Sequence, residues 1–337
     1  MADLQKSTDL QVHFLPWAFR NRIFAHTPHR RIRPKHEHKL SHRLRNSHGL
    51  LVKFLTEGIH MTLHLALIAK TFPTESNELD KTLKIAKEKG GEVALLPECP
   101  AQTWIAATKN ISDTDAEPMG GPREPRQAAA ARSAEIALLG GSIEICKEGN
   151  RLNTAVFWDS KGNEKLRYSK MHIPDEPGFR EAAHYNPSRA RIRCTEHAGW
   201  RIGGQICSDN QRPTGCQMLA ALGCDLILNP RATEETFLER WITIWRANAI
   251  TTGCWIASVN RPEPESGVPL GGPSVLIDPF GKVQMSDDPL TVVSLERQRV
   301  LDARRSYPGY LAIPSDAYAN LWKEIPPRQP WPEGASV

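Results

Sequence analysis

Glu98, Lys170 and Cys207 are the residues whose types and settings best fit catalysis, because each ends a short apolar run. Cys207 closes the run 201–207 and is followed by a polar turn and a helix-like stretch at 214–223. At such a strand-to-helix turn, the next backbone N–H and the helix N-terminus can stabilise a thiolate or an oxyanion. The setting predicts a cysteine nucleophile, although a buried and inert thiol is the commoner fate of a cysteine.

Glu98 and Lys170 supply the other groups that such a thiol needs. Glu98 follows Leu95-Leu96-Pro97, and a carboxylate in a partly desolvated pocket has a raised pKa and can act as a general base. Lys170 opens a loop rich in Pro and Gly, where a fixed ammonium could bind an oxyanion. Taken singly, each is more simply explained as a strand-end glutamate or a solvated lysine. It is their combination with Cys207 that favours catalysis.

The order and contexts of these residues resemble the nitrilase superfamily of carbon–nitrogen hydrolases, with its Glu-Lys-Cys triad. The motifs are LLPE at Glu98, YSKMHIPDEPGF at Lys170 and GGQICSD at Cys207, and the resemblance covers about residues 63–325. It implies a four-layer α-β-β-α sandwich, with the triad at the carboxyl ends of strands and no metal or organic cofactor. Further agreement lies in the segments 152–157, 245–249, 258–261, 271–274 and 278–281.

The lysine loop is most similar to the carbamoylase and amidase branch, especially N-carbamoylputrescine amidase-like proteins. In that branch a second glutamate follows the lysine by about eleven residues, and Glu181 stands there. The resemblance implies that Glu181 orients the substrate and supports Lys170 and the base. It also implies that Glu98 deprotonates Cys207, and that Lys170 and the Ser208 N–H hold the oxyanion. A thioester or S-carbamoyl intermediate would then be hydrolysed.

Residues beside the nucleophile and after the Pro-Glu motif are expected to contact the substrate. Ser208 stands where this branch often has Trp, and Asn210, Gln211 and Arg212 replace a common aromatic-Pro-Glu sequence. These departures affect the prediction of the substrate more than the prediction of the reaction. Arg212 could pair with a substrate carboxylate or hold the elbow through a structural salt bridge. Trp104 is expected to wall the acyl pocket, although it could equally be plain core.

Other functions compete with a cysteine-dependent amidase or N-carbamoyl amidohydrolase acting on a small molecule. The nearest is a nitrile hydrolase of the same superfamily, although true nitrilases usually carry a different loop after the lysine. A catalytically silent binding protein with the same fold is a second alternative, because fold alone does not fix function. A nucleic-acid binder is a third, and it rests only on the basic residues 1–60.

Composition narrows these choices. The chain of 337 residues is 40% hydrophobic and 24% charged, as is ordinary for a soluble globular protein, and no stretch approaches the roughly 20 apolar residues of a membrane span. Residues 1–60 hold 11 Lys+Arg and 4 Asp+Glu, whereas the remainder holds 32 and 34, so the body is near neutral. Seven scattered cysteines without a CxxC pair argue against disulfides and zinc. We therefore expect a cytoplasmic protein with no metal, nucleic-acid or membrane partner.

Residues 1–60 are expected to lie outside the folded domain. They contain eight of the twelve histidines and an Arg/His/Pro cluster at 26–45. A disordered extension, with Met61 as the natural start, is the favoured interpretation. A transit peptide is a second, because the segment is rich in Arg and poor in acid, but Asp3 and Asp9 fit it poorly. A histidine-rich metal tract is the third.

The elements that must position the catalytic residues alternate between strand and helix after Met61. Strands are expected at 63–69, 93–96, 140–145, 154–158, 165–169, 201–207, 225–228, 254–259 and 273–277, and helices at 77–89, 126–139, 214–223 and 234–249. Many of these strands are apolar on both faces, which predicts sheets with helical covers. One domain is expected over 61–300. The aromatic tail 301–337 is expected to pack on that domain or on a second subunit of a homodimer or larger assembly.

Overall fold

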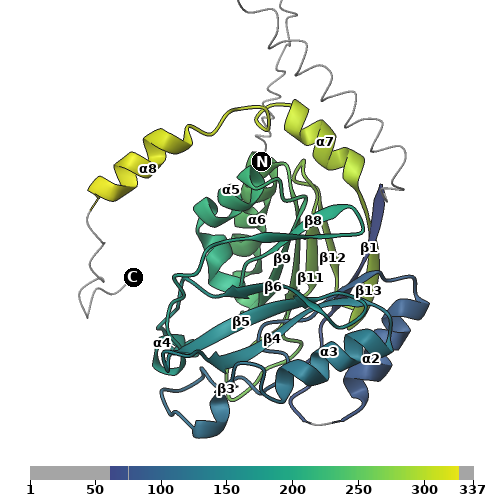
Figure 1. Cartoon of the computed structure of the whole chain (residues 1–337), viewed down its shortest axis with the longest axis vertical. Helices are drawn as coiled ribbons and strands as arrows, with labels where there is room; N and C mark the ends of the chain where they lie inside the picture. The colour runs from purple at the N-terminus through teal and green to yellow at the C-terminus, as the bar shows by residue number, and fades with distance from the viewer. Residues whose placement is uncertain (1–60, 75, 326–337) are drawn as a thin grey trace, which may run out of the picture. The chain divides into compact units, whose positions relative to one another are not determined.

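Two β-sheets form the centre of the computed structural model, which describes residues 61–74 and 76–325 (Figure 1). The expectations for residues 1–60 and for the end of the tail lie outside these residues. The seven-stranded sheet has the order β13-β1-β2-β4-β5-β6, with β3 beside β4, and the six-stranded sheet has the order β12-β11-β10-β9-β8-β7. The strands are β1 Thr62–Ile68, β2 Val93–Leu95, β3 Glu117–Pro118, β4 Ala137–Ile145, β5 Arg151–Trp158, β6 Glu164–Ser169, β7 Cys194–His197, β8 Trp200–Gly204, β9 Leu226–Arg231, β10 Trp255–Asn260, β11 Ser274–Ile277, β12 Val283–Ser286 and β13 Leu290–Glu296.

Strand β1 shows why the sheets are covered on both sides. Leu63, Leu65 and Leu67 belong to the main core, which also contains residues of the six-stranded sheet. Ala66 and Ile68 point the other way, into a second core shared with two helices. Because successive side chains of a strand alternate between faces, a continuous apolar run buries both. The predicted four-layer α-β-β-α sandwich is confirmed.

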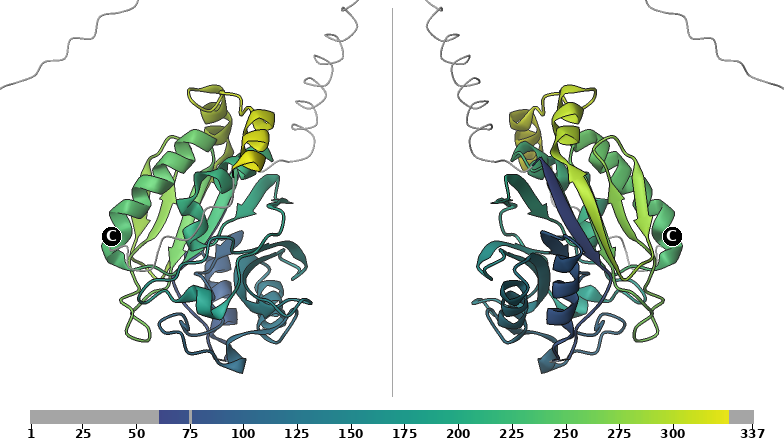
Figure 2. Two further views of the ribbon diagram at one scale, coloured as in Figure 1. Left: turned by 90° about the vertical axis from the view of Figure 1, so that its left-hand side faces the viewer. Right: turned by 90° about the vertical axis from the view of Figure 1, so that its right-hand side faces the viewer.

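The outer layers are helical (Figures 1 and 2). Helices α2 (Glu78–Glu88) and α3 (Arg123–Ser133) pack on the seven-stranded sheet, and α5 (Pro213–Ala221) and α6 (Leu238–Thr252) pack on the six-stranded sheet. Short helical segments lie in the connections between these elements: η1 Asp113–Asp115, α4 Glu181–His184, η2 Cys207–Gln211 and η3 Glu235–Phe237. Of the described helices, none has the length and apolar character needed to span a membrane.

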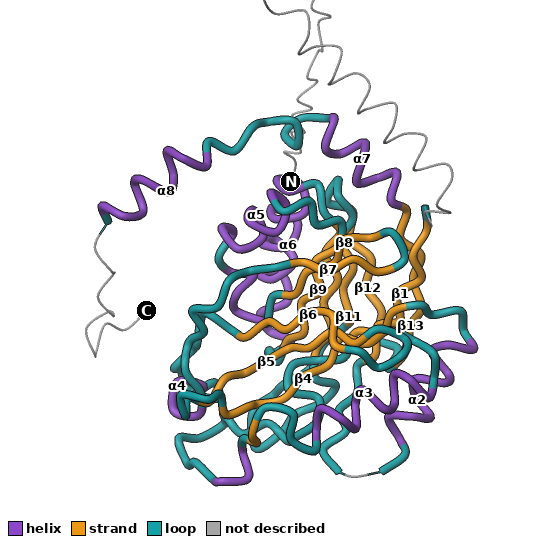
Figure 3. Tube along the Cα trace, viewed as in Figure 1, coloured by secondary structure: helices purple, strands orange, loops and turns teal. Residues whose placement is uncertain are grey.

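The predicted helix 126–139 is wrong in its second half. Helix α3 ends at Ser133, and Glu135 has a φ of 51°, a left-handed conformation that breaks the helix. Strand β4 then begins at Ala137, because residues 137–139 pair in parallel with β2. The alanine run favours a helix by intrinsic propensity, but the non-local pairing decides the structure of its end. The other expected strands and helices are present with shifted ends (Figure 3).

The C-terminal tail divides into a packed and an exposed part. Helix α7 (Arg297–Arg305) buries Val300 and Ala303, whereas α8 (Ser315–Glu324) buries no residue. Tyr307 and Trp322 are 76% and 63% exposed. Contact of these aromatic residues with a second subunit stays a prediction.

Candidate active site

The strand directions bring the predicted catalytic residues to one end of the sandwich. Strands β2 and β6 run the same way, because β2 is parallel to β4 and two antiparallel pairings separate β4 from β6. Glu98 and Lys170, which follow β2 and β6, therefore lie at the same end of the sheet, where both of these strands have their carboxyl ends. The Glu98 N–H donates to the carbonyl of Arg231 at the end of β9, and β9 is parallel to β8, which precedes Cys207. This contact joins the ends of the two sheets.

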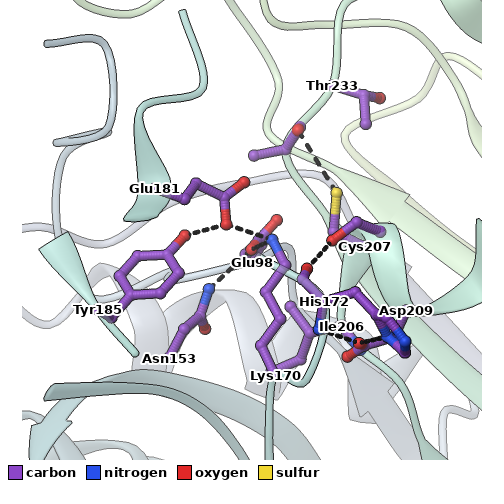
Figure 4. Close-up of polar contacts among 12 residues, drawn as sticks. Glu98, Asn153, Lys170, His172, Glu181, Tyr185, Ile206, Cys207, Asp209 and Thr233 are labelled. Atoms are coloured by element: carbon purple, nitrogen blue, oxygen red, sulfur yellow. Dashed lines mark hydrogen bonds and ion pairs between the residues drawn. The ribbon is translucent and has the colours of Figure 1, made fainter. Parts of the chain in front are cut away.

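Lys170 is held between two buried carboxylates (Figure 4). Its Nζ lies 2.8 Å from Glu98 Oε1 and forms a second ion pair with Glu181 Oε2. The three side chains are fully buried. Glu98 Oε2 and Glu181 Oε1 have no hydrogen-bond partner among the described residues. Buried polar atoms are nearly always paired, so these two oxygens are candidates for contact with a substrate or a water molecule.

The protonation states follow from burial and mutual charge. Burial opposes the charge on Lys170, but the carboxylates of Glu181 and Glu98 outweigh it, and the pKa of Lys170 is raised well above its usual range. Lys170 is therefore an ammonium at neutral pH. Burial, opposed by Lys170, raises the pKa of Glu181 to about 7. Burial and the charge of Glu98 raise the pKa of the Cys207 thiol. Cys207 thus rests as a neutral thiol that needs a base to react.

Cys207 occupies a tight elbow at the start of η2. It is 4% exposed and has a φ of 43°, which is uncommon for a residue other than glycine. Its Sγ lies 3.7 Å from the carbonyl oxygen of Ala232. Such strain is kept where the surroundings over-determine the conformation, and it is frequent at functional sites. The predicted strand-to-helix turn is therefore present, with one short helical segment between β8 and α5.

Asp209 fixes the shape of this elbow. Its fully buried carboxylate accepts hydrogen bonds from the backbone N–H groups of Met171 and His172 and from the Tyr168 hydroxyl, at 2.8–3.1 Å. It also accepts from the backbone N–H of Ile206, 3.3 Å away. One carboxylate thus joins the loop that carries Lys170 to the turn that carries Cys207. This contact fixes the positions of the two reactive groups relative to each other.

Three supporting residues were not predicted. Asn153 donates to Glu98 Oε1 over 2.7 Å, and the Tyr185 hydroxyl donates to Glu181. Arg261 donates to the backbone carbonyls of Glu98, Cys99 and Gln102. Asn153 carried a signal, because it is a polar residue on the strand that pairs with the one leading to Lys170. Arg261 lies about 160 residues from its partners, so no local pattern could have revealed its contacts.

The predicted substrate-binding residues fall into different settings. Trp104 is 3% exposed, donates its indole N–H to Gly178 and packs in a small apolar cluster with Ala232, which contacts Cys207. Its role as a wall of the acyl pocket stays a prediction. The Ser208 hydroxyl donates to the carbonyl oxygen of His172, 2.5 Å away.

The remaining predicted residues of the turn differ in burial. Asn210 is fully buried and its side chain hydrogen-bonds to Gln205 and Cys216, inside the elbow. Gln211 is partly exposed and Arg212 is exposed. Across the described segments, no carboxylate forms an ion pair with Arg212, so the structural salt bridge, one of its two suggested roles, is not formed there. The structure thus brings Glu98, Lys170, Glu181 and Cys207 together, but not Asn210.

Chemically, the arrangement combines an acid–base carboxylate, a fixed ammonium and a thiol in a buried space. Such a set can perform nucleophilic attack on a carbonyl, hold the resulting oxyanion and move a proton to a leaving group. Within residues 61–74 and 76–325, no three His, Cys, Asp or Glu side chains are grouped as a metal ion would require.

Comparison with known proteins gives one consistent result. Residues 57–303 match the sequence model of the carbon–nitrogen hydrolase family. The omega-amidase NIT2 of Xenopus tropicalis is 28% identical over 222 residues, which cover 63% of this chain and 79% of that protein. A hydrolase encoded in the pqqF 5' region of Pseudomonas protegens is 29% identical over 63% of this chain and 73% of its own length.

Solved structures share the fold. A carbon–nitrogen hydrolase from Helicobacter pylori superposes with a TM-score of 0.68 at 20% identity, over 77% of this chain and 98% of that one. A mutant of the amidase from Nesterenkonia sp. superposes with a TM-score of 0.61 at 23% identity, over 79% and 98% of the two chains. In that mutant the acetamide moiety of fluoroacetamide is covalently attached to the active-site cysteine.

Proposed function

This chain belongs to the carbon–nitrogen hydrolases of the nitrilase superfamily, and on that basis we propose that it hydrolyses the C–N bond of small linear amides with Cys207 as nucleophile. The observation that carries the proposal is the burial of Glu98, Lys170 and Glu181 in one charged cluster beside the Cys207 elbow (Figure 4). Omega-amidases and an amidase among the related proteins support an amide substrate.

The proposed reaction begins with proton transfer from the Cys207 thiol to Glu98. The resulting thiolate attacks the amide carbonyl carbon, and the C=O π electrons move to the oxygen. The Lys170 ammonium and the Ser208 N–H stabilise this oxyanion. Glu98 then returns the proton to the leaving nitrogen, the C–N bond breaks, and ammonia or an amine departs from a thioester.

Hydrolysis of the thioester uses the same groups in reverse order. Glu98 takes a proton from a water molecule, whose oxygen attacks the thioester carbonyl. The C–S bond breaks, and the proton returns to the sulfur. Glu181 holds the Lys170 ammonium through both steps, and its own position is fixed by the Tyr185 hydroxyl. Because each step only moves protons and electron pairs between groups already present, the cycle regenerates the resting thiol.

The substrate class is tested by measuring ammonia release from linear amides, N-carbamoyl amines, N-carbamoyl amino acids and nitriles. We expect linear amides to be hydrolysed fastest. The lysine loop, which resembles the carbamoylase branch, makes N-carbamoyl amines the second class to compare. Hydrolysis of nitriles alone would contradict the proposal.

The nucleophile is tested with Cys207→Ala, and with Cys216→Ala as a matched control in the same turn-and-helix segment. Removing the nucleophile of a covalent catalyst costs several orders of magnitude, so we expect at least about a 10³-fold loss of kcat/KM for Cys207→Ala and little change for Cys216→Ala. Rapid acid quenching followed by peptide mass spectrometry should find an acyl adduct on Cys207. Undiminished hydrolysis by Cys207→Ala would refute its role.

A further inference from the structure

The segment that carries Glu98 is a turn with only weak hydrogen bonds of its own. Residues 98–102 form neither a helix nor a strand, and Cys99 has a φ of 47°, which is uncommon for a residue other than glycine. The bonds from the Glu98 N–H to the carbonyl of Arg231 and from the Gln102 N–H to the carbonyl of Cys99 are both 3.4 Å long. Bonds of this length are weak, so the conformation of the turn depends on other contacts.

Arg261 supplies these contacts from a distant part of the chain. It directly follows β10, and its side chain is fully buried. Its Nη1 donates to the carbonyl oxygens of Glu98 and Cys99, at 2.8 and 2.9 Å, and its Nη2 donates to that of Gln102 at 2.9 Å. A single guanidinium thus binds three carbonyl oxygens of one five-residue turn.

Glu265 holds this guanidinium in place. Its carboxylate accepts from Nε and Nη2 of Arg261, at 2.7 Å each, and from the backbone N–H of Trp104 at 2.9 Å. The guanidinium also lies 5.9 Å from the centre of the Trp104 ring. All five of its N–H groups therefore have an acceptor, and its charge is paired. Together, Arg261 and Glu265 hold the backbone from Glu98 to Trp104.

The position of this turn decides where the Glu98 carboxylate lies. Its Oε1 accepts from Asn153 at 2.7 Å and from Lys170 at 2.8 Å, and its Oε2 has no partner among the described residues (Figure 4). These bonds set the direction of the carboxylate, whereas Arg261 anchors the backbone that carries it. A general base must come within about 2.6–3.2 Å of the group whose proton it takes. Because a misplacement of about 1 Å can cost about 10²-fold in rate, the anchor matters for proton transfer.

We propose that Arg261 is a positioning residue, which fixes the turn of Glu98 so that this carboxylate can move a proton from Cys207 to the leaving nitrogen. The inference rests on the proposed function. The hydrogen bonds of Arg261 end on backbone carbonyls and on Glu265, so it acts on the reaction through the position of Glu98. Lysine in its place would keep a positive charge beside Glu265. Its three donors share one nitrogen, however, and cannot reproduce the planar fork of the guanidinium.

The test compares hydrolysis of an amide with that of the p-nitrophenyl ester of the same acid by the full chain. The amide nitrogen must receive a proton from Glu98 before it leaves, whereas p-nitrophenolate leaves without one. We expect Arg261→Lys to lower kcat/KM by about 10²-fold for the amide and by about tenfold or less for the ester. Arg246→Lys is the matched control, because Arg246 also binds a backbone carbonyl, that of Gly281, but is exposed on α6. The control should leave both values unchanged.

A merely structural role of Arg261 would reduce the amount of active enzyme and lower both values by the same factor. Equal losses for the two substrates, or an unchanged amide value, would overturn the proposal. If Arg261→Lys does not fold, Glu265→Gln replaces it, because this variant loosens the guanidinium without removing it, and the same ratio of amide to ester values decides. Failure of the proposed function would instead show as undiminished amide hydrolysis by Cys207→Ala, in which Arg261 is intact.

Discussion

Two clusters, each with several glutamates around its own cation, lie on the seven-stranded sheet. They differ in whether their carboxylate oxygens all have hydrogen-bond partners. The Lys170 cluster consists of Glu98, Lys170 and Glu181, and the Arg167 cluster consists of Glu124, Glu144, Glu164 and Arg167. Their cations stand three residues apart, at the end of β6. The Lys170 side chain is fully buried, whereas that of Arg167 is 20% exposed.

The Arg167 cluster is closed by its own hydrogen bonds. The guanidinium donates to both carboxylate oxygens of Glu124 and of Glu164 and to one oxygen of Glu144. The second oxygen of Glu144 accepts from Thr154. In the Lys170 cluster, by contrast, one oxygen of each carboxylate has no partner among the described residues. A compact ammonium cannot satisfy two carboxylates as the planar, five-donor guanidinium does.

This difference indicates that charge density alone does not mark a reactive site. The Arg167 cluster has more glutamates, yet each of their carboxylate oxygens has a hydrogen-bond partner. The Lys170 cluster keeps free acceptor oxygens next to a thiol, which is what proton transfer requires. We therefore propose that the Lys170 cluster serves catalysis and that the Arg167 cluster serves stability.

Replacing each cation with methionine should separate these roles most strongly. We expect Lys170→Met to lower kcat/KM by at least about 10³-fold, because the oxyanion loses its ammonium. We expect Arg167→Met to leave kcat/KM within about twofold and to lower the free energy of unfolding by about 2–3 kcal/mol, because buried Glu124 and Glu144 lose their partner. Steady-state kinetics and urea unfolding measure the two effects. Loss of activity in Arg167→Met with an unchanged fold would contradict the stability role of the Arg167 cluster.

Tyr185→Phe should have an intermediate effect that depends on pH. The Tyr185 hydroxyl donates to Glu181, and this bond lowers a pKa that burial has raised to about 7. Ionised Glu181 holds the Lys170 ammonium, so kcat/KM should fall as the pH drops through about 7. Removing the hydroxyl raises the pKa of Glu181 further, so the fall should begin at higher pH. We expect a several-fold loss near pH 6.5 and little loss near pH 8.5, in a pH–rate profile.

An unchanged profile midpoint in Tyr185→Phe would show that Glu181 does not titrate in the active range. Tyr168→Phe is a suitable control, because its hydroxyl donates to Asp209 at the same end of the sandwich but not to Glu181. We expect the control to keep the midpoint of the wild type.

Much of this comparison could be anticipated from the sequence, because Glu98, Lys170 and Cys207 each follow an apolar strand directly. Local patterns predict these strands, but the meeting point of the three residues depends on strand direction, which the sheet pairings show. The alternation of strands and helices likewise predicted the layered fold. The helix α3 boundary was missed, since non-local pairing of 137–139 with β2 overrode the propensity of the alanine run.

The remaining features depend on contacts between distant segments. Arg231 and Arg261 are ordinary strand-end residues in the sequence. Only the packed structure shows that Arg231 binds neutral acceptors such as Ser258 and that Arg261 binds the backbone after β2. Asn210 was expected to contact the substrate because it follows the nucleophile closely. Its side chain instead turns into the elbow toward Gln205, a direction that depends on the backbone of η2.

The smallest effect is expected at the exposed edge of the Arg167 cluster. Glu164 is 44% exposed and lies three residues from Arg167 on the same strand. Exposed ion pairs contribute about 0–1 kcal/mol, so Glu164→Gln should lower the free energy of unfolding by about 0.5 kcal/mol or less and leave kcat/KM unchanged. Glu144→Gln, at a side chain only 2% exposed, should cost clearly more in the same urea titration. Equal losses in the two variants would mean that burial does not set the strength of this cluster, and its assignment to stability would then need another cause.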